Sequence, residues 1–136
     1  DYEKRWPLGE IADRIGPMLS PGLRAGVARG RQMSAQRYVA LLQGRDAARD
    51  ALAALAGEVD ACLTLSATGP APRGLGSTGD SGFNVPASYL RCPALSLPLL
   101  QADGLPLGLQ ILGQPGQERA LSSVARWLVS KGAGGR

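Results

Sequence analysis

Apolar and polar positions alternate most regularly in the last third of the chain. Leu105, Leu107, Leu109 and Ile111 occupy every second position, which is the period of a β-strand and places four branched side chains on one face. The opposite face carries Gly108 at its centre, which leaves room for another element or a ligand to approach the backbone closely.

A second apolar run, 94–100, precedes this strand and is joined to it by a linker that ends in Asp103-Gly104. Asp-Gly between two apolar runs is typical of a tight hairpin turn. Pro98 and Pro106 have no backbone N–H to donate, and proline favours strand ends, edges and bulges. We therefore expect an irregular hairpin rather than a long regular ladder.

Helical spacing of apolar residues marks most of the remaining chain. Ser20-Pro21 predicts a helix start, because serine caps free amide groups and proline is favoured at the first helical position. The predicted helical segments are 1–16, interrupted at Pro7; 22–31; a longest helix capped by Ser34 and ending near Gly57; and 117–130.

A short strand is predicted over 60–66, followed by a loop rich in Gly, Pro, Ser and Thr over 67–82. The fold class is therefore α/β, with an incomplete mixed sheet of about three strands, including the hairpin, packed with helices. Because three strands are few for so many helices, we infer that missing chain or a partner supplies further strands.

The 136 residues are predicted to form one domain-sized segment. Its helical part is 1–59, its strands, loop and final helix occupy 60–130, and a tail follows at 131–136. The sequence begins at Asp1 without a methionine and looks like a piece of a longer chain. It shows no secretory pattern and no apolar run near the roughly 18 residues that span a bilayer, so we expect a cytoplasmic protein without membrane contact.

The net charge of +4 comes mainly from arginines in the first half of the chain. These arginines are mixed with Asp46, Asp50 and Glu58 and lack interleaved aromatic residues for base stacking. A solvated helix surface is therefore favoured over nucleic-acid binding.

Histidine is absent, which excludes a Cys/His metal site and any Ser-His-Asp or Cys-His mechanism within this sequence. Cys62 and Cys92 are expected to be buried thiols in a reducing compartment. Cys92 has no neighbouring His or Lys in the sequence to lower its pKa, so a catalytic role for this thiol is disfavoured. We expect no metal and no cofactor.

The stretch GSTGDSG at 76–82 has glycines that could expose amides to an anion, but it lacks the lysine of a phosphate-binding loop. Asp80 could act as a general base, although a local turn is favoured for an aspartate after glycine. Phe83 is of interest as a pocket wall. The Asn84 side chain offers a donor and an acceptor to an amide, and turn stabilisation is equally open.

Several stretches, taken in order, resemble the C-terminal part of the amidase signature family. They are the tyrosine-bearing helix, DACLTLS at 60–66, AP at 71–72, TGD with FN at 78–84, CPALSLP at 92–98 and GLPLGLQILG at 104–113. The resemblance covers 19–128. Each piece is unspecific alone, but the ordered set with its spacing is distinctive.

The resemblance implies hydrolysis of small-molecule carboxylic amides by a serine nucleophile, a bridging cis-serine and a lysine base, without metal or cofactor. Those catalytic groups precede the matched part, so we assign no catalytic residue here and expect this chain alone to be inactive. The resemblance further implies that the hairpin belongs to the central sheet. It also implies that Thr78, Asp80, Phe83 and Asn84 form one wall of a substrate pocket completed by the missing N-terminal part.

Two positions depart from the family pattern. Ser66 stands where proline is common after the strand, and Arg91 stands near a common glycine, which would change the shape or charge of the wall. Two alternatives stay open beside the hydrolase: an A-subunit-like component of a glutamine-dependent tRNA amidotransferase, and a non-catalytic interaction module. A homo-oligomer is also left open.

Overall fold

The computed structural model describes residues 1–132, and the chain divides into two compact units, Asp1–Gly44 and Arg45–Arg136. Of the predicted tail at 131–136, Lys131 and Gly132 end the last helix, and 133–136 lie outside the described residues. Within residues 1–132, no helix is both long and apolar enough to cross a bilayer.

The first unit is helical. Its elements are η1 (Glu3–Arg5), α1 (Pro7–Ile15), η2 (Gly16–Met18), α2 (Pro21–Gln32) and the first half of α3 (Ala35–Ala54). Pro7 is the first residue of α1, which confirms the interruption predicted there. The Ser20 hydroxyl accepts a hydrogen bond of 3.3 Å from the Leu23 N–H, and the Ser34 hydroxyl accepts one of 3.1 Å from the Arg37 N–H. Both predicted caps are confirmed.

Aromatic stacking joins the start of the chain to α3. The ring of Tyr2, which is 7% exposed, stacks on the ring of Tyr38 with centroids 4.1 Å apart. The Arg5 guanidinium lies 3.8 Å from the centroid of the Tyr2 ring in a cation–π contact. On α2, the exposed Arg29 and Arg31 form ion pairs of 2.8 Å and 2.7 Å with aspartates of the same unit. These two arginines have the solvated surface positions that the charge pattern predicts.

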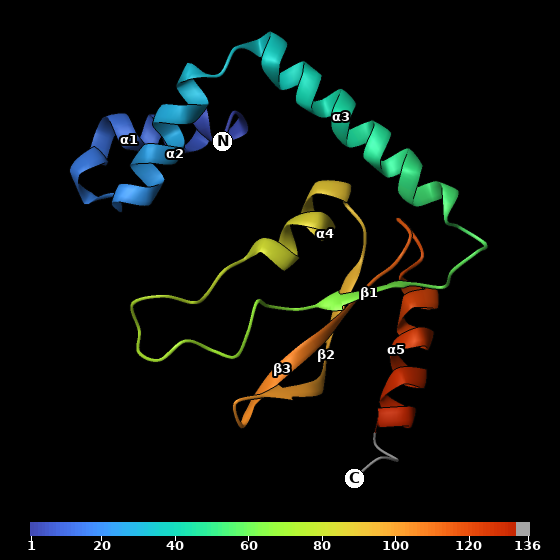
Figure 1. Cartoon of the computed structure of the whole chain (residues 1–136). Coiled ribbons are helices and arrows are strands. Elements are labelled where there is room, and N and C mark those ends of the chain that lie inside the picture. Colours follow the sequence, from blue (N-terminus) through green and yellow to red (C-terminus); the bar gives the residue numbers. More distant parts are fainter. Residues whose placement is uncertain (133–136) are drawn as a thin grey trace. The chain divides into compact units, whose positions relative to one another are not determined.

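The second unit contains a three-stranded sheet of order β1-β3-β2. Its strands are β1 (Cys62–Leu65), β2 (Ala94–Ala102) and β3 (Leu105–Leu112), and its helices are the second half of α3, η3 (Gly82–Asn84), α4 (Val85–Leu90) and α5 (Glu118–Gly132). Both strand pairings are antiparallel. The pairing places β3 between the other two strands, and Figure 1 shows α5 beside the sheet. The α/β class with about three strands is confirmed.

The predicted hairpin forms, with Asp103 and Gly104 at φ values of 53° and 75°. Two successive positive φ angles are the signature of the tight turn that Asp-Gly favours. The register of β2 against β3 shifts between Leu97 and Leu100, around Pro98, as expected for an irregular hairpin. Pro106 stays within β3 because β1 pairs only with 109–112, beyond the proline.

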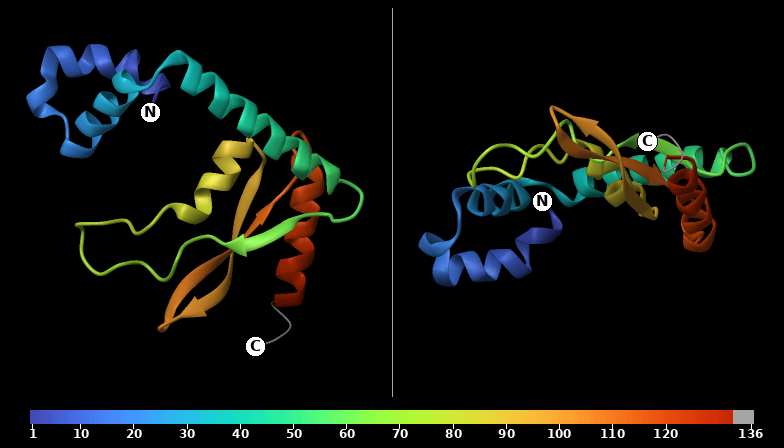
Figure 2. Two further views of the ribbon diagram at one scale, coloured as in Figure 1. Left: turned by 45° about the horizontal axis from the view of Figure 1, so that its top comes forward. Right: turned by 90° about the horizontal axis from the view of Figure 1, so that it is seen from below.

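One face of the sheet is covered by α5, as the two views of Figure 2 show. The core consists of Leu97, Ile111, Leu121 and Ala125, and the side chains of Ile111 and Leu121 are 0% and 1% exposed. On β3, burial falls toward the turn, where Leu105 is 44% exposed. The predicted apolar face is therefore covered at the Ile111 end of β3 and open at the hairpin end.

The longest helix begins as predicted but ends at Ala54, before Gly57, and none of its residues is buried. Gly57 follows in a turn with a φ of 91°. The apolar residues that follow helical spacing here are therefore half-buried or exposed, and none lies in the core.

Candidate functional site

The long loop after β1 is a series of local turns. The Ser77 hydroxyl accepts a hydrogen bond of 3.1 Å from the Gly79 N–H, and Gly79 has a φ of 93°. The Asp80 carboxylate accepts a hydrogen bond of 2.6 Å from the Gly82 N–H. The turn role favoured for Asp80 is thus confirmed. Thr78 is exposed in the loop between these turns.

Phe83 and Asn84 lie in η3, where the loop returns to the sheet. The Gln110 side chain, which belongs to a residue 4% exposed, donates a hydrogen bond of 2.8 Å to the Phe83 carbonyl. The Asn84 N–H donates to the Ser81 carbonyl at 2.9 Å, while the Asn84 side chain is exposed and does not cap α4. The central strand therefore fixes the backbone of η3, and the Asn84 amide faces solvent.

The structure thus gathers three of the four predicted wall residues, Asp80, Phe83 and Asn84, in η3 and the turn that precedes it. The sequence did not predict the side chain that holds the Phe83 backbone, Gln110. The feature of the sequence that could have indicated this role is a long polar side chain in an otherwise apolar strand, on the same face as Gly108.

A pair of serines lies on this face of the sheet. The Ser66 and Ser96 hydroxyl oxygens are joined by a hydrogen bond of 2.6 Å that passes over Gly108. A Cβ on Gly108 would lie 2.3 Å from the Ser96 oxygen and 2.4 Å from the Ser66 oxygen. The close approach predicted for Gly108 is confirmed, and the occupant of the space is this serine pair.

Strand register explains why this face is polar. Thr64 of β1, Gln110 of β3 and Ser96 of β2 are direct partners across the sheet. Because side chains alternate along a strand, they point away from the face on which Leu97 and Ile111 pack against α5. The sheet therefore has an apolar face under α5 and a polar face linked to η3.

Cys62 and Cys92 are both free thiols, and Cys92 is 9% exposed. Burial raises the pKa of Cys92 above its ordinary value of 9.0, and the charge of Cys62 adds to this rise against a lowering backbone hydrogen bond. A thiol held protonated is a poor nucleophile, which agrees with the interpretation that Cys92 is not catalytic. Among residues 1–132, no group of three or more Cys, Asp or Glu side chains is placed to hold a metal ion.

Arg91 ends α4 in the left-handed conformation, with φ 54° and ψ 42°. Glycine adopts this conformation without steric cost, whereas a side chain such as that of arginine costs free energy there. The backbone at Arg91 therefore has a conformation that glycine adopts more readily than arginine.

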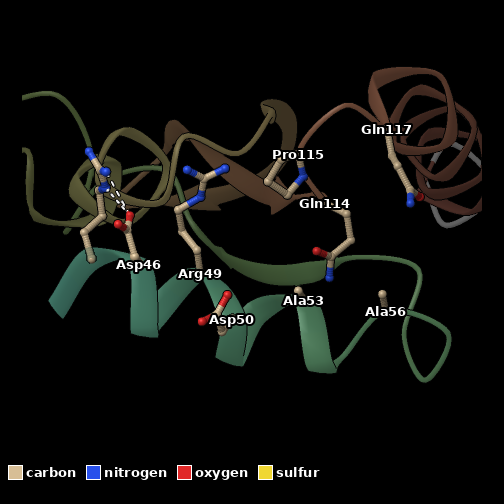
Figure 3. Close-up of a pocket in the computed structure, with 9 residues that line it drawn as sticks. Asp46, Arg49, Asp50, Ala53, Ala56, Gln114, Pro115 and Gln117 are labelled. Carbon is tan, nitrogen blue, oxygen red and sulfur yellow. Dashed lines mark hydrogen bonds and ion pairs between the residues drawn. The ribbon is translucent and has the colours of Figure 1, made fainter. Parts of the chain in front are cut away.

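A groove of about 630 Å³ lies elsewhere, between the second half of α3 and the segment that follows β3. Figure 3 shows its lining: Arg45, Asp46, Arg49, Asp50, Ala53, Ala56, Gln114, Pro115 and Gln117. The Gln114 side chain donates to the Leu52 carbonyl at 2.7 Å and so ties α3 to the segment after β3. Its charges are of both signs, and none of the four predicted wall residues lines it. We assign no chemistry to this groove.

No protein-family model matches the chain. Among curated proteins, it is 32% identical over 129 residues to a fatty acid amide hydrolase of Medicago truncatula, in an alignment that covers 85% of this chain and 21% of that protein. It is 39% identical over 88 residues to the glutamyl-tRNA(Gln) amidotransferase A-subunit of Methylorubrum extorquens (strain PA1), which covers 57% of this chain and 18% of that protein. The chain therefore spans about a fifth of the length of these relatives.

The fold matches a solved structure described as the crystal structure of an amidase. The TM-score is 0.84 at 26% sequence identity, and the match covers 96% of this chain and 33% of the solved chain. The described elements of both units thus recur within one third of a longer protein.

Proposed function

Because the homologues of this chain and the amidase that it matches in structure are proteins of the amidase signature family, we propose that it is the C-terminal part of an amidase-type hydrolase. Its substrates are linear carboxylic amides. The observation that carries the proposal is the match of 96% of the chain to an amidase with a TM-score of 0.84. In this proposal residues 1–136 form a single part of an amidase domain in the cytoplasm, and the catalytic serine, cis-serine and lysine lie outside them.

The chain's own serine pair supports the placement of the catalytic groups elsewhere. Ser66 and Ser96 share a hydrogen bond, but a Ser-Ser-Lys centre also needs a lysine base. The sequence has two lysines, Lys4 and Lys131. Lys4 forms an ion pair with Asp1 in the first unit, and Lys131 lies in the last turn of α5, which packs on the other face of the sheet from the serines. The serine pair is therefore scaffold.

In this proposal η3 and the loop before it form a pocket wall. The Gln110–Phe83 hydrogen bond fixes the wall to the central strand, and the exposed Asn84 amide can donate to and accept from a substrate amide. Asp80 contributes by holding the turn at Gly82. The wall positions the substrate, and the reaction takes place on groups that the rest of the fold supplies.

The test compares the 136-residue chain with the product of the longer reading frame that contains it, on a panel of short, aromatic and fatty-acyl primary amides, by ammonia release. We expect hydrolysis by the longer product only, abolished when its upstream lysine is replaced by alanine. An upstream sequence with neither that lysine nor a serine-rich segment would refute the hydrolase. Hydrolysis by the 136 residues alone would refute the placement of the catalytic groups.

A second candidate is an A-subunit-like component of a tRNA amidotransferase, which the 39% identity to a glutamyl-tRNA(Gln) amidotransferase A-subunit favours. The two candidates differ in what ammonia release requires. Release from simple amides without tRNA or other protein chains indicates the hydrolase. Release from glutamine only together with partner chains indicates the amidotransferase.

A further inference from the structure

Arg91 occupies the position that ends α4. Its backbone is left-handed, with φ 54° and ψ 42°, and the next N–H, that of Cys92, donates to the Ala87 carbonyl at 3.1 Å. This hydrogen bond closes many helices, and glycine is the usual residue at the left-handed position. A residue with a Cβ costs free energy there. The end of α4 therefore accounts for the backbone conformation but not for the arginine side chain.

Contacts within the chain do not account for this side chain either. Arg91 is exposed, and among residues 1–132 its guanidinium forms no ion pair and no hydrogen bond. The backbone that carries it is fixed, because Cys92 is 9% exposed and the Pro93 carbonyl accepts a hydrogen bond of 2.9 Å from the Gly113 N–H. Residues that the surrounding structure holds in a costly conformation are concentrated at functional sites.

Arg91 is also the only charged residue in the sequence between Asp80 and Asp103. This stretch forms η3, α4 and β2. Asn84 precedes α4 and Arg91 follows it, and both are exposed. At a rise of 1.5 Å per residue, the two positions lie about 10 Å apart along the helix. One small molecule can therefore contact the Asn84 amide and the Arg91 guanidinium across an uncharged surface.

We propose that Arg91 is a specificity-determining residue that selects amides with a carboxylate at the other end of the acyl chain. This inference rests on the proposed function. The substrate amide meets Asn84, the hydrocarbon chain lies along α4, and the carboxylate accepts hydrogen bonds from Arg91. Arginine suits this role because its planar guanidinium can donate two parallel N–H···O bonds to one carboxylate.

The test uses the product of the longer reading frame and measures ammonia release from monoamides of straight-chain dicarboxylic acids of increasing length. Each is compared with the amide of equal length that ends in a methyl group. The measured quantity is the preference, the ratio of kcat/KM for the carboxylated amide to kcat/KM for the methyl-ended one. Arg91→Gln should lower the preference by about tenfold or more at the lengths that reach Arg91, because a charged hydrogen bond is lost. Arg91→Lys should restore part of it.

Two further variants separate this effect from folding and from total charge. Arg91→Gly relaxes the left-handed backbone, so it should lose the preference while remaining at least as stable as wild type in urea. Arg126→Gln removes the same charge from an exposed position on α5 and should leave the preference unchanged. Added salt should lower the preference of wild type but not that of Arg91→Gln.

Amide hydrolysis with the same preference in wild type and Arg91→Gln would overturn the inference and leave the proposed function standing. Equal loss in Arg126→Gln would assign the preference to total charge and would also overturn the inference. If the longer product hydrolyses no amide, the proposed function fails, and equilibrium dialysis with radiolabelled adipic acid monoamide tests Arg91 directly. Binding that weakens about tenfold in Arg91→Gln would support the carboxylate site, whereas equal binding or none would overturn it.

Discussion

Replacement of Gly108 by alanine tests whether the sheet is built around the serine pair. The added Cβ would lie 2.3 Å from the Ser96 oxygen, 2.4 Å from the Ser66 oxygen and 2.8 Å from the Ser66 Cβ. The hydroxyls can rotate away, at the cost of their mutual hydrogen bond of 2.6 Å, which is worth about 1 kcal/mol. Rotation does not relieve the contact with the Ser66 Cβ, so β1 and β3 must also shift.

Overpacking of this kind costs about 1–3 kcal/mol, and the lower flexibility of alanine in the unfolded chain returns about 0.5–1 kcal/mol. We therefore expect Gly108→Ala to lower the free energy of unfolding of the second unit by about 1–3 kcal/mol. Gly69→Ala is the matched control, because nothing lies within 4 Å of a Cβ built there.

Urea denaturation followed by tryptophan fluorescence measures this effect. Trp6 lies in the first unit and Trp127 in the second, so a Trp6→Phe background makes Trp127 the reporter of the unit that contains Gly108. When Ser66 and Ser96 are both alanine, Gly108→Ala should lower the free energy of unfolding by a smaller amount, but still measurably. Crowding around the serine pair is refuted if Gly108→Ala is as stable as wild type, or if the substitution lowers the free energy of unfolding equally with and without the two hydroxyls.

Three further predictions concern the wall and the thiols. Arg91→Gly should raise the free energy of unfolding by about 0.5–1 kcal/mol, since it removes left-handed strain of about 1–2 kcal/mol but adds flexibility to the unfolded chain, whereas Arg91→Lys should be neutral by urea denaturation. Gln110→Leu leaves the Phe83 carbonyl unpaired and should cost about 1–3 kcal/mol and speed proteolysis near η3, an effect absent from Gln101→Leu at an exposed position. Because the pKa of Cys92 is raised in the folded chain, its contribution to stability is complete below pH 9.0 and is lost as pH rises through the folded pKa. Urea midpoints from about pH 7 to about pH 11 should therefore fall more steeply for wild type than for Cys92→Ala. Equal slopes would contradict a raised pKa of Cys92 in the folded chain.

The elements that the sequence predicts well are those set by neighbours in the chain. Asp103-Gly104 forms its turn, and Ser20 and Ser34 cap their helices, because each depends on backbone groups a few residues away. The Asp80 turn was predictable for the same reason. These features follow from local chemistry whatever the rest of the fold does.

The features that the sequence did not predict depend on register between distant segments. The Ser66–Ser96 pair requires that segments on either side of β3 bring two hydroxyls together over Gly108. The Gln110–Phe83 bond joins a strand to a segment that precedes the hairpin. The absence of buried residues in α3 was not predicted. Apolar spacing identifies which side of a helix is apolar, but it does not show whether another element covers that side. The role of Thr78, Asp80, Phe83 and Asn84 as a substrate wall stays a prediction.

The link between Gln110 and Phe83 makes the position of the wall depend on the packing of the sheet. Gln110 lies two positions from Gly108 on the same face, so a shift of β3 that relieves the crowded serines also moves the donor that holds η3. Because Gln110 is 4% exposed, water cannot readily replace it on the Phe83 carbonyl. If the proposed function holds, Gly108→Ala in the longer enzyme should therefore raise KM for amides more than it lowers kcat, because in that proposal the wall positions the substrate and the reacting groups lie outside this chain. A variant with reduced kcat and unchanged KM would mean that the sheet face acts on the chemical step, and the separation of wall from catalytic centre would have to be abandoned.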